Sequence, residues 1–216
     1  AWTDTVVSSP EEARQETEAT LTDTQFMSST RYCAVLAAAS LLTWVSWSQS
    51  VAAGVPTTST ETASRTVEDG GTGPHKTLMV SDKTLATHTV FRPNDLSGFG
   101  EKVKLPIVVW GNGACANSPW EHVKFLSEVA SHGFLVIAIG PMPAEGQRRV
   151  AGGPTKSVML VDAINWAIAQ HSDKSSQYYQ KLDTCKIAAA GMSCGGLQAL
   201  EVAPDPRIST LMVCNS

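Results

Sequence analysis

The sequence predicts an α/β protein in which helices cover both faces of a mostly parallel sheet. Short apolar segments rich in β-branched residues recur between residues 77 and 216, which is typical of strands buried on both faces. Segments with helical spacing separate these strands over short connections, as in parallel sheets with crossover helices. The chain of 216 residues is long enough for one domain with a sizeable core.

The expected elements begin at residue 77. Residues 77–81 and 87–92 predict two short strands joined by a turn at Asp82-Lys83. Buried strands are then expected at residues 106–110, 134–139 and 186–190, a fourth strand at 208–214 that would form a bare edge of the sheet, and helices at 118–131, 158–169 and 195–202. Ser118-Pro119 is a typical start for the first helix, and Gly133 ends it. Trp166 is expected in the core, and Tyr178-Tyr179 in a surface loop.

The segment before residue 54 differs from the rest of the chain. Residues 1–26 contain six acidic residues and one basic residue, and we interpret them as a disordered acidic extension. Residues 27–53 resemble a signal peptide, because Arg31 precedes an apolar run and small residues end at Ala53. The alternative is an uncleaved anchor, but the run is shorter than the roughly 20 residues of a membrane span. We therefore expect a secreted protein without a stable membrane anchor.

Residues 54–76 are rich in Ser, Thr and Gly, which predicts a mobile or O-glycosylated leader and places the folded domain at residues 77–216. After cleavage of the signal, four cysteines remain, and an oxidising compartment allows three pairings among Cys115, Cys185, Cys194 and Cys214. The sequence has no zinc-type spacing of His and Cys, so we expect no metal or other cofactor. Its net charge of −4 argues against a nucleic-acid partner. The oligomeric state is left open.

The stretch Gly191-Met192-Ser193-Cys194-Gly195-Gly196 lies between an expected strand and an expected helix. A Gly-x-Ser-x-Gly turn in this setting exposes the serine hydroxyl above the sheet, which predicts Ser193 as a nucleophile. The N–H of Cys194 and the start of the helix would stabilise an oxyanion. The alternative interpretation is an incidental glycine-rich loop.

A second polar loop, residues 111–117, follows the strand at 106–110. We expect the N–H of Ala114 to be the second oxyanion donor, with Gly113 as the weaker candidate. Cys115 lies on this loop, and we hypothesise a disulfide between Cys115 and Cys194; the alternative is two buried thiols. The candidate residues for a substrate pocket are Trp110, Asn112, Trp120, Met142 and Met192.

Residues 108–113, 131–137 and 191–196 resemble secreted α/β-hydrolases of the group that holds polyester hydrolase/cutinase-like, chlorophyllase-like and dienelactone-hydrolase-like enzymes, and also platelet-activating-factor acetylhydrolases. The resemblance covers residues 77–216. Those families usually have His-Gly or Pro-Gly where Asn112-Gly113 stands here. The resemblance implies the α/β-hydrolase fold and hydrolysis of a carboxylic ester, in a small molecule or a polymer, through an acyl-enzyme.

The acid and the base of such a site are not found in this chain. On this fold they follow the serine in the order Asp or Glu, then His, but no histidine follows Ser193. Glu201 and Asp205 lie too close to the nucleophile, and His122 is a weak candidate for the base. We therefore expect a fragment that lacks the last strands and helices of the fold and is inactive and poorly stable alone.

Two other functions remain open. One is a peptidase or acyltransferase on the same fold, and the other is a non-catalytic binding protein with the α/β-hydrolase fold. The binding protein is favoured only if the acid and the base are absent from the complete reading frame.

Overall fold

The computed structural model describes residues 60–144 and 153–216. Contacts divide the chain into residues 1–52 and 53–216, and all described residues belong to the second unit. The acidic extension, the signal peptide and the cleavage site expected from the sequence lie outside the described residues. Within residues 60–144 and 153–216, none of the helices has both the length and the hydrophobicity that a membrane span requires.

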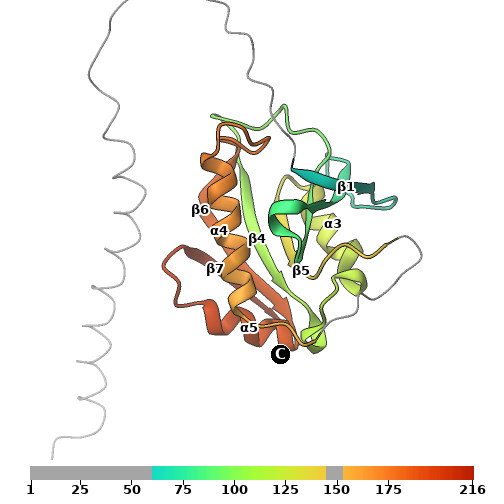
Figure 1. Ribbon diagram of the computed structural model, residues 1–216, viewed down its shortest axis with the longest axis vertical. Helices are drawn as coiled ribbons and strands as arrows, with labels where there is room; N and C mark the ends of the chain where they lie inside the picture. Colours follow the sequence, from blue (N-terminus) through green and yellow to red (C-terminus); the bar gives the residue numbers. More distant parts are fainter. Residues whose placement is uncertain (1–59, 145–152) are drawn as a thin grey trace, which may run out of the picture. The chain divides into compact units, whose positions relative to one another are not determined.

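Seven strands form one mixed sheet in the order β1-β2-β3-β5-β4-β6-β7 (Figure 1). In chain order they are β1 (Glu61–Thr66), β2 (Thr77–Asp82), β3 (His88–Pro93), β4 (Leu105–Gly111), β5 (Leu135–Ile139), β6 (Leu182–Met192) and β7 (Ile208–Cys214). The first three strands and the β3–β5 pair are antiparallel, whereas β5, β4, β6 and β7 run parallel. The α/β fold with a mostly parallel sheet is therefore confirmed.

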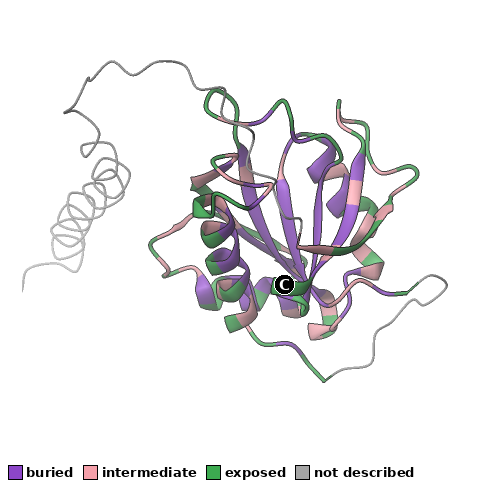
Figure 2. Cartoon of the chain, turned by 45° about the horizontal axis from the view of Figure 1, so that its top comes forward, coloured by how far each residue is buried: buried purple, intermediate pink, exposed green. Residues whose placement is uncertain are grey.

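Helices cover both faces of this sheet. Helix α3 (Val123–Ser131) packs on one face, while α4 (Val158–Ser172) and α5 (Cys194–Val202) pack on the other. Along β4 the side chains alternate between these two cores: Ile107 and Val109 face α4 and α5, and Val108 and Trp110 face α3. Figure 2 shows the central strands buried between the helix layers. Burial on both faces explains the continuous apolar runs in these strands.

The first core helix begins later than the sequence predicts. Residues Trp120–His122 form a 3₁₀ turn, η3, and the α-helix starts only at Val123. Pro119 precedes the 3₁₀ turn, and Ser118 Oγ accepts a weak hydrogen bond from Trp120 N at 3.4 Å. The predicted end is correct, because Gly133 follows the helix with φ +88°, a conformation that suits glycine.

The folded domain begins before residue 77, which corrects the predicted leader of residues 54–76. Strand β1 pairs antiparallel with β2 at the edge of the sheet. Its side chains are mostly exposed, so it shows little of the apolar alternation that marks a strand in a sequence. Residues 54–59 lie outside the described part of the chain.

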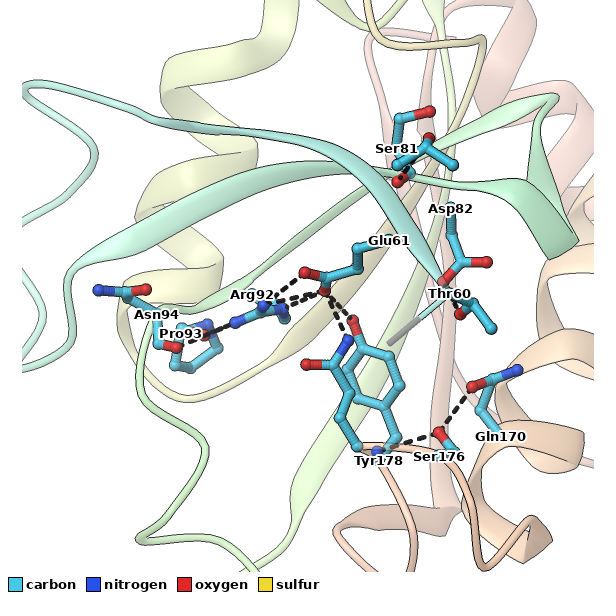
Figure 3. Close-up of polar contacts among 12 residues, drawn as sticks. Thr60, Glu61, Ser81, Asp82, Arg92, Pro93, Asn94, Gln170, Ser176 and Tyr178 are labelled. Atoms are coloured by element: carbon cyan, nitrogen blue, oxygen red, sulfur yellow. Dashed lines mark hydrogen bonds and ion pairs between the residues drawn. The ribbon is translucent and has the colours of Figure 1, made fainter. Parts of the chain in front are cut away.

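A buried polar cluster joins β1 to the sheet and to the segment before β6 (Figure 3). Arg92 donates to Glu61 through Nε and Nη2, both at 2.9 Å, and their side chains are only 6% and 14% exposed. Tyr178 donates its hydroxyl hydrogen to Glu61 Oε1 at 3.2 Å. Tyr178 is 1% exposed, so its predicted place in a surface loop is wrong, and burial raises the pKa of its phenol. The phenol can be buried because Glu61 accepts a hydrogen bond from its hydroxyl group. Glu61 belongs to β1, the strand that was not expected from the sequence.

We expect Glu61→Ala to lower the free energy of unfolding by about 3 kcal/mol or more, because it leaves the buried Arg92 guanidinium without its counter-charge. Urea unfolding of the full-length protein measures this change. The control is Lys186→Ala, since Lys186 forms an ion pair with Asp183 while its side chain is 72% exposed. The control variant should stay within about 0.5 kcal/mol of the wild type. Equal effects of the two substitutions would contradict a structural role for β1.

Candidate active site

Ser193 stands at the turn between β6 and α5. Its φ of 50° and ψ of −119° are rare for a residue other than glycine, and the residue is exposed. Neighbouring backbone holds this conformation, because Ser193 N donates to Cys214 O at 2.8 Å. Ser193 O accepts from Gly196 N at 2.9 Å and Leu197 N at 3.2 Å. A strained serine on a sharp strand-to-helix turn is the local geometry of a nucleophile elbow.

The glycines of this turn are required by close approach of the backbone. A Cβ on Gly195 would lie 2.0 Å from Gly111 O, and a Cβ on Gly191 would lie 2.2 Å from Gly195 O. The start of α5 therefore packs directly on the end of β4. No side chain fits between these two segments.

The turn lies at the switch point of the parallel sheet. Gly111, the last residue of β4, pairs with Gly191 of β6. The chain leaves β4 to build β5 on one side, and it later returns to build β6 on the other. In open α/β sheets, ligands bind outside the carboxyl ends of the strands at such a point.

The loop after β4 faces the serine turn. It contains the 3₁₀ turn η2 (Gly113–Cys115), in which Ala114 and Cys115 have φ values of 53° and 48°. A Cβ on Gly113 would lie 3.1 Å from the Met192 Cε, so the two loops touch. Ala114 is exposed, and its side of the loop is open to solvent.

A disulfide joins the two loops. Cys115 and Cys194, the pair hypothesised from the sequence, are bonded with a Cα–Cα distance of 5.2 Å. The bond connects the η2 turn to the first residue of α5, directly after Ser193. Among the described residues, Cys214 is the free cysteine.

Two expected pocket residues are buried. Asn112 is 1% exposed, and its amide donates to Ala116 O at 2.9 Å and to Ile139 O at 2.6 Å. Trp110 is 2% exposed and packs against Phe125 and His122. Asn112 therefore holds the loop from within, whereas Trp110 packs in the core beside α3. The other candidates, Trp120, Met142 and Met192, are partly buried.

No hydrogen bond joins a histidine to Ser193 among the described residues. His122 packs its ring 5.3 Å from that of Trp110, and burial lowers its pKa. His88 is buried beside the Met159 carbonyl, and burial lowers its pKa as well. His132 pairs with Glu128 at the end of α3, and His171 Nδ1 accepts from Leu182 N.

Within residues 60–144 and 153–216, we also find no group of three His, Cys, Asp or Glu residues that could hold a metal ion.

Sequence analysis missed two polar residues behind the η2 loop, Thr155 and Gln198. Gln198 is 4% exposed and donates to Thr155 O at 2.9 Å, and Thr155 N donates to Cys115 O at 3.0 Å. A signal for Gln198 was present in the sequence. It stands in the buried stripe of α5 with Gly195, Ala199 and Val202, where an amide needs a partner.

Comparison with known proteins now adds to this geometry. Residues 49–213 match a family model described as PETase, PET hydrolase-like. The chain belongs to this PET hydrolase-like family. No curated protein matches the sequence. The PET hydrolase-like match agrees with the resemblance to polyester hydrolases and gives the chain the α/β-hydrolase fold and the activity of a hydrolase that acts on esters.

We expect Gly195→Ala to lower the free energy of unfolding by about 3 kcal/mol or more, because the new methyl group meets the Gly111 carbonyl and neither backbone can move away. Denaturant unfolding of the purified full-length variant measures this loss. Gly98→Ala is the matched control, since a Cβ at Gly98 has nothing within 4 Å. A Gly195→Ala protein as stable as the Gly98→Ala protein would show that α5 does not rest on β4 in this way.

Removal of the disulfide by the double substitution Cys115→Ala and Cys194→Ala should cost about 4 kcal/mol of stability, because the bond closes a loop of 79 residues. Thermal and urea unfolding under non-reducing conditions measure the difference. Cys214→Ala is the control and should change stability by less than about 1 kcal/mol. If a reductant destabilises the wild type and the double variant equally, the pairing is wrong.

Proposed function

We propose that the chain is a serine-dependent carboxylic ester hydrolase in which Ser193 is the nucleophile. The observation that carries this proposal is that Ser193, between β6 and α5, has a strained backbone and is exposed to solvent. Such strain needs support from the surrounding chain, and it is common where a side chain must be presented to a substrate. The family of the chain supplies the class of bond, an ester.

In the proposed reaction, Ser193 Oγ attacks the carbonyl carbon of the ester while a general base takes the hydroxyl proton. The tetrahedral intermediate collapses, the C–O bond to the alcohol breaks, and the proton passes to the departing alcohol. Water then attacks the carbonyl carbon of the acyl-enzyme, the carboxylic acid product is released, and the Ser193 hydroxyl is restored. The general base is not assigned among the described residues.

We further propose that the N–H groups of Cys194 and Ala114 form the oxyanion hole. Cys194 is the first residue of α5, so its N–H has no carbonyl partner within the helix, and the start of the helix favours negative charge. Ala114 lies on the facing η2 loop in a left-handed conformation, and Gly113 is the second candidate on that loop. The disulfide keeps the two donor loops together.

The proposed substrate is an ester whose carbonyl group can reach an exposed serine. The PET hydrolase-like family of the chain points to a polyester, poly(ethylene terephthalate), as one such ester. An exposed serine at the carboxyl end of β6 suits a polymer, because a long chain does not have to enter a deep cavity. Trp120, Met142 and Met192 are the partly exposed apolar side chains that we propose for contact with it.

The protein is also proposed to be secreted. The apolar segment before Ala53 has the form of a signal peptide. The disulfide between Cys115 and Cys194 supports export, because such bonds persist in oxidising compartments. Mass spectrometry of the N-terminus of the exported protein tests this proposal.

Ser193→Ala should abolish labelling by a fluorophosphonate and lower kcat on a soluble ester by at least about a thousandfold, because no other group can form the acyl-enzyme. The measurement uses the full-length protein, that is, the product of the complete reading frame, with p-nitrophenyl esters and a polyester film as substrates. Ser209→Ala is the control, since Ser209 Oγ bonds Ile187 O on β6 and takes no part in the turn. A wild-type protein that neither reacts with the probe nor hydrolyses any ester would instead favour a non-catalytic binding protein.

A further inference from the structure

A short chain of hydrogen bonds behind the η2 loop runs from Gln198 through Thr155 to Cys115. Gln198 Nε2 donates to Thr155 O at 2.9 Å and to Thr155 Oγ1 at 3.1 Å. Thr155 in turn donates to Cys115 O twice, through its N–H at 3.0 Å and its hydroxyl at 3.2 Å. Gln198 and Thr155 are 4% and 8% exposed, so water competes little for these bonds.

These contacts end on the part of the loop that needs support most. Ala114 and Cys115 are consecutive residues in the left-handed region. This conformation costs roughly 1–2 kcal/mol for each residue other than glycine. Because the Cys115 carbonyl is held by two hydrogen bonds, rotation of the Cys115 backbone out of this conformation would break both of them.

The loop is therefore tied to α5 at two points. The side chain of Cys115 is bonded to Cys194, at the first position of the helix. The backbone of Cys115 is tied through Thr155 to Gln198, four residues later and on the same side of the helix. The disulfide limits how far the loop can move, whereas the hydrogen bonds fix the direction of its peptide groups.

We propose that Gln198 is a positioning residue that, through Thr155, orients the η2 loop so that its N–H donors face the Ser193 turn. This role rests on the proposed function, since it assumes that Ala114 or Gly113 stabilises an oxyanion. Gln198 acts on the loop and does not touch the substrate.

The orientation of the amide supports a role as donor. Gln198 Oε1 is buried without a hydrogen-bond partner and lies beside Gly111, where a Cβ would be 3.0 Å away. The side chain thus leaves its acceptor unpaired while its NH₂ group reaches Thr155 and, at 3.4 Å, the Cys115 sulfur. An unpaired buried acceptor is unfavourable. The amide nevertheless turns its NH₂ group to the loop, because the Thr155 carbonyl oxygen can only accept a hydrogen bond.

The test compares Gln198→Met and Thr155→Val with the wild type in the full-length protein. Methionine keeps the length of the side chain but lacks the amide donor, and valine keeps the shape of threonine but lacks the hydroxyl, while the N–H of residue 155 remains. We expect kcat on a soluble ester to fall about 10- to 100-fold, while KM stays within about twofold, because the oxyanion forms only after binding. Thr155→Val keeps the two backbone contacts of residue 155, so it should lose less activity than Gln198→Met. The double variant should lose no more than Gln198→Met, because both side chains belong to one chain of contacts.

Gln170→Met is the matched control. Gln170 is a buried glutamine on α4 that accepts from Ser176 Oγ at 2.6 Å, in the region shown in Figure 3. This variant also loses a buried hydrogen bond, but it should leave kcat within about twofold of the wild type. A loss of kcat equal to that of Gln198→Met would overturn the proposal in favour of a general loss of stability.

Amide hydrogen exchange of residues 113–117 gives a readout that does not depend on activity. It should become at least about tenfold faster in Gln198→Met and stay unchanged in Gln170→Met. Unchanged exchange in Gln198→Met would show that Gln198 does not hold the η2 loop. Faster exchange with unchanged kcat would show that its hold on the loop does not matter for catalysis. If fluorophosphonate does not label the wild type, the proposed function itself is wrong, and the exchange rates alone then decide whether Gln198 holds the loop.

Discussion

The contact of bare backbone between Gly111 and Gly195 determines how the rest of the site is built. It brings the end of β4 against the first turn of α5 with no side chain between them. The two loops that follow β4 and β6 consequently lie close enough for a disulfide with a Cα–Cα distance of 5.2 Å. A bulkier residue at either glycine would separate the serine turn from the loop that faces it.

Helix α5 has several roles in this arrangement. Its first residue continues the strained turn of Ser193 and carries the sulfur of the disulfide, and its second turn carries the buried amide of Gln198. Its apolar side packs against the core of the sheet. One helix therefore positions both loops, and the two ties on Cys115 that oppose strain in the η2 loop both lead to α5.

Much of the fold could be predicted from the sequence because its central strands are buried on both faces. Strands β4 and β5 were found to within about one residue, because continuous runs of β-branched residues are typical of buried strands. Strand β7 was found as well, although it lies at the end of the sheet and its side chains are mostly exposed. Strand β1 was missed because its exposed, Thr- and Ser-rich side chains resemble a linker. Tyr178 was misplaced for the same reason, as its partner Glu61 belongs to that strand.

The site was predictable in part. The spacing of Gly191, Ser193 and Gly195 indicated the turn, because a close approach of backbone restricts those positions to small residues. Asn112 and Trp110 were expected to line a pocket, but both side chains turn inward: Asn112 holds the loop, and Trp110 packs against Phe125 of α3. Contacts such as Gln198 to Thr155 join residues 43 positions apart, and no local pattern in the sequence reports them.

The order of strands also has a consequence for the kinetics of folding. The segment between β4 and β6 contains α3, β5 and α4, so the contacts of the site are of long range. Closing so long a loop is slow compared with forming local helices and hairpins. Pairing of β4 with β6 holds the thiols of Cys115 and Cys194 next to each other, so we expect the native disulfide to accumulate together with this pairing. The rate at which this disulfide forms during oxidative refolding therefore reports how fast the site assembles.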